Sequence, residues 1–255
     1  MIARRCRLAA MLLSVFSLLM LTAAGDAWAM SFEVSPVRLA LSPAAPSGLV
    51  NLRNQSSESL RLEVTGYSWN QGPDGTMLIE PTQDIVFFPS LVTLNPGESR
   101  NLRVGISTSF GATEKTYRIF VEELPPLVRA AGQPNAVHVL TRMGIPVFLN
   151  ATPPLAAPRL EGSSLDHAHF SFSLHNRGTG HFLAKKLVIA ALAADGTKVT
   201  EVSLPAWYVL AGGVRVYKVD LPSAACTAAR LQMQVVTDAT TVDATFAVPA
   251  GACQP

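Results

Sequence analysis

The distribution of apolar residues after residue 30 constrains the fold of this chain more than any other feature. Apolar and polar residues alternate there in short runs, and residues typical of turns separate the runs. Side chains of a strand point alternately to the two faces of a sheet, so this period of two predicts strands with one buried face. In the first half of the chain the expected strands are Val37–Leu41, Leu49–Leu52, Leu60–Val64, Val86–Phe88, Leu102–Ile106, Tyr117–Val121 and Val137–Leu149. Seven short strands at this spacing predict a β-sandwich.

A proline-rich break follows this first series. The segment Ala151–Pro158 contains three prolines, which lack a backbone N–H and interrupt strand pairing. An alternating run ends in asparagine on both sides of the break, at Asn54 and at Asn176. Two copies of one sandwich type would produce this repeat, and chance similarity is the alternative. The strands expected after the break are His169–Leu174, Lys186–Leu192, Val199–Leu204, Val214–Val219, Leu231–Thr237 and Ala244–Val248.

Residues 1–29 have the order of a secretory signal peptide. Arginines at the start precede an apolar run from Leu8 to Ala24, and Ala27–Ala29 offers a cleavage site. We therefore expect an exported mature chain that begins near Met30 and carries no membrane anchor. An uncleaved anchor is the alternative, although a run of about 17 apolar residues is short for a membrane span.

Charge and motifs exclude several classes of function. Without residues 1–29 the chain keeps 17 basic and 17 acidic side chains, because three arginines and one aspartate are removed. This balance gives no general reason to expect nucleic acid or an anionic membrane as a partner. The sequence contains no G-x-S-x-G, P-loop, H-E-x-x-H or glycine-rich dinucleotide motif, so we expect neither an enzyme nor a cofactor. His167 and His169 could form a metal site, but we interpret them as surface histidines and expect no metal.

Two of the three cysteines remain after removal of the signal peptide. Both Cys226 and Cys253 lie in the second half of the chain, whereas Cys6 leaves with the signal. An even pair of cysteines in an exported protein predicts a disulfide, and two sulfurs alone are too few ligands for a metal site.

Four segments, in this order along the chain, resemble one known family. They are Ser35–Leu39, Phe87–Val104, Tyr117–Pro126 and Arg142–Phe148. Together with the turn at Asn54 and with Trp69, they resemble the periplasmic pilus chaperones of the PapD-like family, which are built from immunoglobulin-like sandwiches. The resemblance covers the first domain and is weaker over the second, where Leu174–Gly178 and Thr237-Asp238 match.

The resemblance implies an architecture and a function. The architecture is all-β, with two immunoglobulin-like β-sandwich domains joined at an angle and a cleft between them. We place the domains at residues 30–152 and 159–255, with a linker at 153–158. The implied function is that of a periplasmic chaperone, which binds, folds and delivers pilus or fimbrial subunits by donor-strand complementation without ATP. The implied partners are these subunits and the outer-membrane usher.

The resemblance assigns Arg38 to a carboxylate anchor. Arg38 lies between Val37 and Leu39, and a charge within an apolar strand must face water or a partner anion. In the family, the arginine of the first strand lies in the cleft and binds the subunit's C-terminal carboxylate, whereas a solvated Arg38 is the alternative. Family members carry a second cation, a lysine, where this chain has Gly144. Arg142 projects from the same face two residues earlier, which makes it the candidate for the second charge and indicates a divergent branch.

The resemblance also assigns the donor strand to the run that ends the first domain. In the family this edge strand completes the sandwich of an incomplete subunit, supplying ladder hydrogen bonds and apolar side chains. Val137, Val139 and Met143 share one face and are the candidates to fill the subunit groove. The alternative is that these side chains pack into the chain's own core.

Some assignments stay open at this point. Glu123 and Asp238 match members of the family's interdomain salt-bridge network, but Phe148 and its neighbours include no arginine. A self-capping dimer of the free protein is an open alternative. So is a different function, that of a tandem immunoglobulin-like structural or adhesive module, such as a pilus subunit. A subunit would carry an alternating extension before its first strand, whereas the first strand here is expected within a few residues of Met30.

Overall fold

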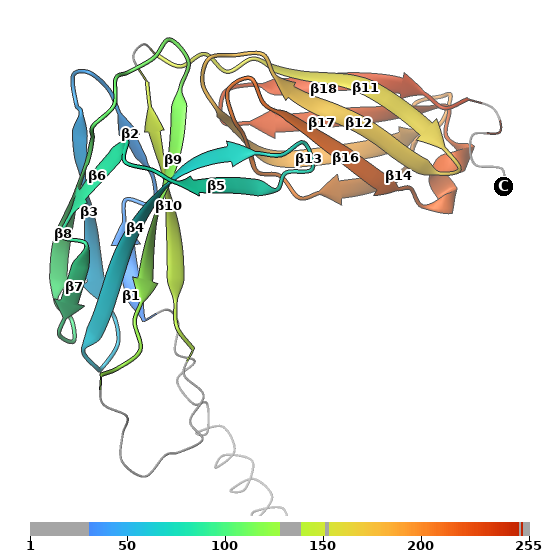
Figure 1. The fold of residues 1–255 in the computed structure, drawn as a ribbon. Coiled ribbons are helices and arrows are strands. Elements are labelled where there is room, and N and C mark those ends of the chain that lie inside the picture. Colours follow the sequence, from blue (N-terminus) through green and yellow to red (C-terminus); the bar gives the residue numbers. More distant parts are fainter. Residues whose placement is uncertain (1–30, 128–138, 151–152, 250, 252–255) are drawn as a thin grey trace, which may run out of the picture. The chain divides into compact units, whose positions relative to one another are not determined.

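The computed structural model describes residues 31–127, 139–150, 153–249 and 251, and they form almost only strands and their connections (Figure 1). The described residues from Phe32 onward belong to one compact unit. Within it, β1–β10 build one sandwich and β11–β18 build a second. The predicted all-β fold with two sandwich domains is confirmed.

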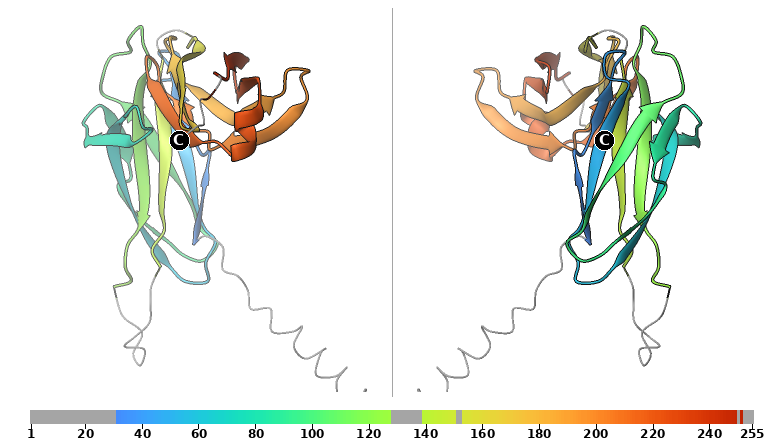
Figure 2. Two further views of the ribbon diagram at one scale, coloured as in Figure 1. Left: turned by 90° about the vertical axis from the view of Figure 1, so that its right-hand side faces the viewer. Right: turned by 90° about the vertical axis from the view of Figure 1, so that its left-hand side faces the viewer.

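Two sheets form the first sandwich, and their strands run beside one another in two layers (Figure 2). The first sheet has the order β1 (Phe32–Ser35), β3 (Ser47–Asn54), β8 (Ser99–Ile106) and β6 (Ile85–Phe88). The second has the order β2 (Leu39–Leu41), β10 (Arg142–Leu149), β9 (Lys115–Glu123), β4 (Leu60–Gln71) and β5 (Met77–Pro81), with β7 (Leu91–Leu94) also paired to β4.

The chain changes sheets between β1 and β2. β1 pairs antiparallel with β3, whereas β2 pairs parallel with β10 in the other sheet. The expected strand Val37–Leu41 is therefore shorter in the structure, because the residues that cross between the sheets are not paired. Arg38 lies immediately before β2, so it is not in the middle of a strand as expected.

The first core lies between these two sheets. Alternation decides which side chains enter it, as on β9, where Tyr117, Ile119 and Val121 are buried in the core. The residues that alternate with them on β9, Arg118 and Phe120, point to the outer face of the same sheet. This outer face carries the site described below.

The second sandwich also has two sheets around one core. One sheet contains β11 (Pro158–Asp166), β12 (His169–Asn176) and β16 (Val214–Asp220). The other contains β14 (Lys198–Leu204), β13 (Phe182–Leu192), β17 (Arg230–Thr237) and β18 (Thr241–Ala247), with β15 (Tyr208–Val209) paired to β13. A short 3-10 helix, η1 (Ser223–Thr227), precedes β17.

The asparagines of the suspected repeat occupy equivalent places. Asn54 ends β3 and Asn176 ends β12, and both side chains are buried. Asn54 accepts the Ser56 N–H at 2.8 Å and donates to the Leu94 carbonyl at 3.0 Å. The Asn176 side chain bonds five backbone groups, which belong to Ala157, Gly178, Gly180, Val209 and Leu210. Each sandwich thus uses a buried asparagine to fix the loop that follows a strand.

We expect Asn176→Ala to lower the free energy of unfolding of the second sandwich by about 2–3 kcal/mol, because it leaves buried backbone groups without partners. Urea unfolding of the purified chain measures this loss. Asn101→Ala is the control, since Asn101 accepts one exposed hydrogen bond from Asn51. Equal small effects of both substitutions would show that the Asn176 bonds contribute little.

Candidate functional site

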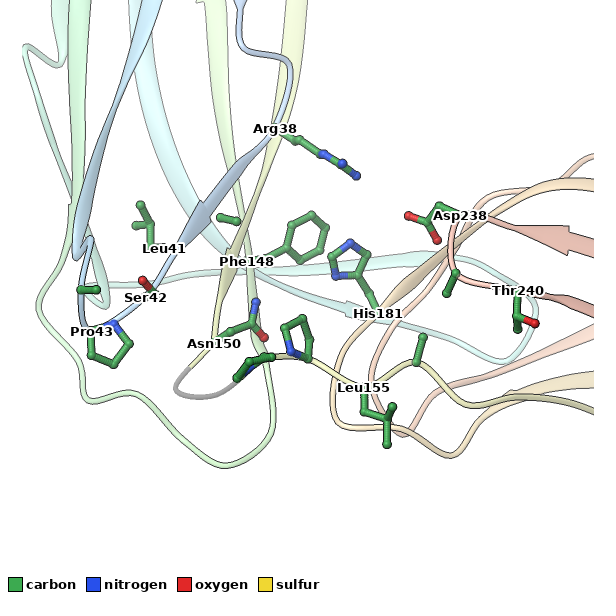
Figure 3. Close-up of a pocket in the computed structure, with 16 residues that line it drawn as sticks. Arg38, Leu41, Ser42, Pro43, Phe148, Asn150, Leu155, His181, Asp238 and Thr240 are labelled. Atoms are coloured by element: carbon green, nitrogen blue, oxygen red, sulfur yellow. The ribbon is translucent and has the colours of Figure 1, made fainter.

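An open cleft of about 1070 Å³ lies between the first sandwich, the linker and the second sandwich (Figure 3). Arg38 and Phe148 line it from the first sandwich, Pro153–Ala156 from the linker, and His181 and Asp238 from the second sandwich. Figure 3 shows Arg38 and Asp238 reaching into this space from opposite sides. The cleft therefore contains the arginine that was expected as its anchor.

Aromatic side chains form the contact between the sandwiches. Phe148, near the end of β10, stacks on the His181 ring with 3.6 Å between ring centroids. Trp69 of β4 meets the edge of Tyr208 at 5.7 Å, and Leu210 completes the buried cluster. Because Phe148 points away from the first core, the end of β10 contributes this side chain to the contact between the two sandwiches.

A buried carboxylate and a histidine connect the sandwiches beside this cluster. Glu114, just before β9, has a fully buried side chain. Its two oxygens lie 2.8 and 2.9 Å from His181 Nδ1, and the His181 backbone N–H donates to one of them at 3.0 Å. From the opposite direction, the Glu114 N–H donates to the Thr179 carbonyl at 2.8 Å. The family resemblance predicts an acidic residue in the contact between the domains, and in the structure Glu114 makes such a contact.

Of the two acidic residues expected at the interface, Asp238 lines the cleft and Glu123 does not. Glu123 is at the other end of β9 from Glu114, and its backbone N–H donates to the Thr141 carbonyl at 2.9 Å within the first sandwich. Asp238 lines the cleft and accepts the Leu183 N–H at 2.9 Å within the second sandwich. Sequence reasoning did not identify the Glu114–His181 pair, since the two residues are 67 positions apart.

The hairpin of β4 and β5 makes a second connection. The Gln71 side chain donates to the Tyr208 carbonyl at 2.8 Å, and the Val216 N–H donates to the Pro73 carbonyl at 2.6 Å. These bonds attach the first sandwich to β15 and β16.

Arg38 is exposed at the edge of the cleft. In the described part of the chain it forms no ion pair. Leu39 pairs with Val147 in the parallel ladder, so Arg38 is beside Pro146 of β10 by extension of the same register. Its guanidinium is available to a partner in the cleft.

Arg142, the expected second cation, is not beside Arg38. It is four residues from Pro146 along β10, which corresponds to about 13 Å. Its Nε lies 3.2 Å from Glu122, and its guanidinium lies 4.0 Å from the centre of the Phe120 ring. A neighbouring carboxylate therefore already pairs with Arg142.

Arg118 is the cation next to Arg38 in the sheet. It pairs with Pro146 from β9, on the side of β10 opposite to Arg38, and its side chain is 8% exposed. Its guanidinium lies 4.3 Å from the centre of the Trp69 ring, and burial lowers the pKa of this group. Arg118 lies in the expected strand Tyr117–Val121, and no role was predicted for it from the sequence. A charge within the apolar run Tyr117–Val121 was the signal that could have identified it.

Half of β10 has a free edge. β9 pairs with β10 along its whole length, whereas β2 pairs with the other edge only from Val147 to Leu149. Among the strands in the described residues, none pairs with the remaining edge, from Arg142 to Pro146. An unpaired edge of this kind is a template for another strand.

The backbone groups on this edge follow from the ladder. Glu123 donates to the Thr141 carbonyl, so Thr141 and every second residue after it bond to β9. Arg142 and Gly144 therefore direct their N–H and C=O groups to the free edge. Pro146 adds a carbonyl without an N–H. The edge thus offers pairing groups at Arg142 and Gly144 and loses its donor at Pro146.

The three candidate donor side chains differ in position. Val137 lies outside the described residues. Val139, shortly before β10, is 84% exposed, and its neighbour Leu140 is 41% exposed. Met143 is half-buried and packs against the first core, which is the alternative that the sequence left open for it.

Other predicted features are only partly described. Residues 1–30 and Cys253 lie outside the described residues, and Cys226 lies in η1. No group of three metal-ligating side chains is found in the portion that is described. The strands and loops described here include no helix long and apolar enough to cross a membrane.

Comparison with known proteins finds a family model that matches the first sandwich. Residues 31–153 match the family described as pili and flagellar-assembly chaperone, PapD N-terminal domain. Among curated proteins, no sequence matches this chain significantly.

Solved structures share the fold across both sandwiches. One is the CsuC–CsuE chaperone–tip adhesion subunit pre-assembly complex from the archaic chaperone-usher Csu pili of Acinetobacter baumannii, with a TM-score of 0.59 at 18% identity over 85% of this chain and 97% of that chain. Another is the SafA pilin in complex with the SafB chaperone of Salmonella enterica, with 0.54 at 11% identity over 87% and 98%. The CupB2 chaperone of Pseudomonas aeruginosa gives 0.53 at 12% identity over 85% and 100%. At these identities the likeness concerns the fold.

Proposed function

We propose that this chain, which belongs to the PapD-like family of pili and flagellar-assembly chaperones, captures pilus or fimbrial subunits in the periplasm by donor-strand complementation. One observation carries the proposal. The free edge of β10 from Arg142 to Pro146 starts beside the exposed Val139 and ends beside Arg38 in the cleft. A subunit strand along this edge would gain ladder bonds, apolar contacts and a cation in one continuous surface.

Each part of this surface has a distinct role. The N–H and C=O groups of Arg142 and Gly144 pair with the subunit strand, and Val139, with Val137 before it, enters the open groove of the subunit. Arg38 binds the C-terminal carboxylate of the subunit. Because Pro146 lacks a donor, pairing ends close to Arg38, which fixes the register of the bound strand.

The proposed function needs no catalytic chemistry. The sequence has no nucleotide-binding motif, so we infer that capture proceeds without ATP. Release to the outer-membrane usher follows when the strand of another subunit replaces β10. The family is a chaperone family, in agreement with a role in binding rather than catalysis.

Expression of the tagged chain in the periplasm, with the pilus genes of its own organism, tests the proposed function. We expect a small β-rich pilus subunit to co-purify with the chain in a 1:1 complex. Subunits that reach normal levels when the chain is deleted, together with a tagged chain that purifies alone, would contradict the proposal.

A disulfide between Cys226 and Cys253 is part of the same proposal. The two cysteines close a loop within one exported domain, where such a bond stabilises a small fold. Intact-mass measurement with and without reduction and alkylation is expected to show two protected thiols in protein from the periplasm. Two freely alkylated thiols without reduction would exclude the bond.

A further inference from the structure

Arg118 is a buried cation that finds no hydrogen-bond acceptor among the residues the structure describes. Its side chain is 8% exposed, and its Nε has no hydrogen-bond partner within residues 31–127, 139–150 and 153–249. Its ring contact with Trp69 satisfies no N–H group of the guanidinium fork. A buried charge is costly unless an anion or hydrogen-bond acceptors compensate it. An anion that joins Arg118 in the working complex would compensate this buried charge.

Arg118 and Arg38 share one row of the sheet. Arg118 pairs with Pro146 from β9, and Arg38 is beside Pro146 on the other edge of β10. Neighbouring strands are about 4.8 Å apart, so the two Cα atoms are separated by about 10 Å, with Pro146 between them. Both side chains belong to the outer face of the sheet, and each arginine is long enough to reach a carboxylate above Pro146.

Gly144 makes room for the Arg118 side chain. A Cβ atom at Gly144 would lie 3.1 Å from Arg118 Nη1 and 2.9 Å from the Phe120 ring. A longer side chain at this position would therefore occupy the space that the guanidinium uses. The glycine on β10 and the arginine on β9 thus complement each other, and the positive charge lies above β10 although its backbone belongs to β9.

We propose that Arg118, together with Arg38, forms the carboxylate site of this chaperone, and that Arg142 does not belong to it. The inference rests on the proposed function, because the ligand is the C-terminal carboxylate of a captured chain. The two arginines bind this group from the two sides of Pro146, at the point where the free edge of β10 ends. Arg142 is excluded because it lies about 13 Å from Pro146 along the strand and because its Nε pairs with Glu122 at 3.2 Å.

The first test uses a small probe, so that it does not depend on finding a subunit. N-acetyl-phenylalanine carries the free carboxylate of a chain end, and N-acetyl-phenylalaninamide is its neutral control. In full-length protein labelled with ¹⁵N-arginine, the Nε–H resonances of Arg38 and Arg118 are expected to shift with the acid and not with the amide. Arg118→Met and Arg38→Met should each weaken binding of the acid by about 30-fold or more, and Arg142→Met should leave it unchanged.

A second measurement separates ligand binding from a structural role. Arg118→Met keeps the packing against Trp69 and removes the unpaired charge, so its melting temperature should equal or exceed that of the wild type. Arg118→Lys should recover part of the binding, because it restores one positive charge. Normal binding of the acid by Arg118→Met or by Arg38→Met overturns the proposal, and so does a wild-type protein that does not bind the acid.

Subunit capture distinguishes this inference from the proposed function. If Arg118→Met captures subunits as well as the wild type does, the inference fails and the chaperone function stands. If the acid binds through both arginines but the wild type captures no subunit, the carboxylate site stands and the chaperone function fails.

Discussion

Replacing Arg38 with alanine is expected to abolish subunit capture and to leave the chaperone folded. Arg38 is exposed in the cleft and pairs with no acidic residue in the described part of the chain, so the free protein loses little. In the proposed complex, its guanidinium would face the subunit carboxylate inside the cleft, and both groups would lose water on binding. Removing one partner of a desolvated charge pair costs about 2–5 kcal/mol, which corresponds to a loss of about 30-fold to several thousand-fold in affinity.

The experiment compares the yield of co-purified subunit with the melting temperature of the free variant. Arg142→Ala is the matched control, since Arg142 lies on the same outer face but is paired with Glu122. We expect the control to keep most of the subunit yield. Normal yield with Arg38→Ala would remove Arg38 from the site, and equal losses in both variants would indicate a general effect of positive charge.

Replacing Val139 with aspartate is expected to weaken the affinity for the subunit by about 100-fold or more. The side chain is 84% exposed in the free chain, so the free energy of unfolding should change by no more than about 0.5 kcal/mol. In the proposed complex this position would enter the apolar groove of the subunit, where burial of an unpaired carboxylate costs several kcal/mol. Subunits should then aggregate or be degraded on co-expression, while the variant itself accumulates normally.

Two further substitutions serve as controls for Val139. Leu49→Asp places a charge on another exposed apolar position, in the other sheet, and should not affect capture. Met143→Asp should destabilise the free chain by about 2 kcal/mol or more, because Met143 packs against the first core. A large drop in melting temperature for Val139→Asp would instead mean that Val139 belongs to the chain's own core.

Alternation along the chain was enough to predict most strands. Runs such as Leu102–Ile106 and His169–Leu174 bury every second residue, so their period of two is visible without the structure. β5 and β11 were not predicted, because most of their residues are exposed and their sequences show little contrast between the two faces. Pro158 also appeared to belong to the linker, although it begins β11 as an edge residue that needs no N–H.

The site was less predictable, since it depends on pairs of residues that are distant in sequence. Arg38 could be singled out because a charge stands next to apolar neighbours. Arg118 satisfies the same criterion, but its position beside Arg38 depends on the register of β9 and β2 against β10. Arg142 was the candidate because it lies two residues from Gly144 on the same strand. Spacing along one strand cannot show which residues of neighbouring strands lie closer. The pairing of Glu114 with His181 likewise depends on the contact between two sandwiches.

Hydrogen exchange at β10 tests the central claim, that this edge completes the subunit, most directly. The amides of Arg142 and Gly144 face the free edge, whereas those of Met143 and Ile145 bond to β9 and act as internal controls. In the free chain we expect fast amide exchange at Arg142 and Gly144 and slow exchange at Met143 and Ile145. In the purified complex with a subunit, Arg142 and Gly144 should become protected, with little change at Met143 and Ile145. Fast exchange at Arg142 and Gly144 in the complex would contradict donor-strand complementation by β10.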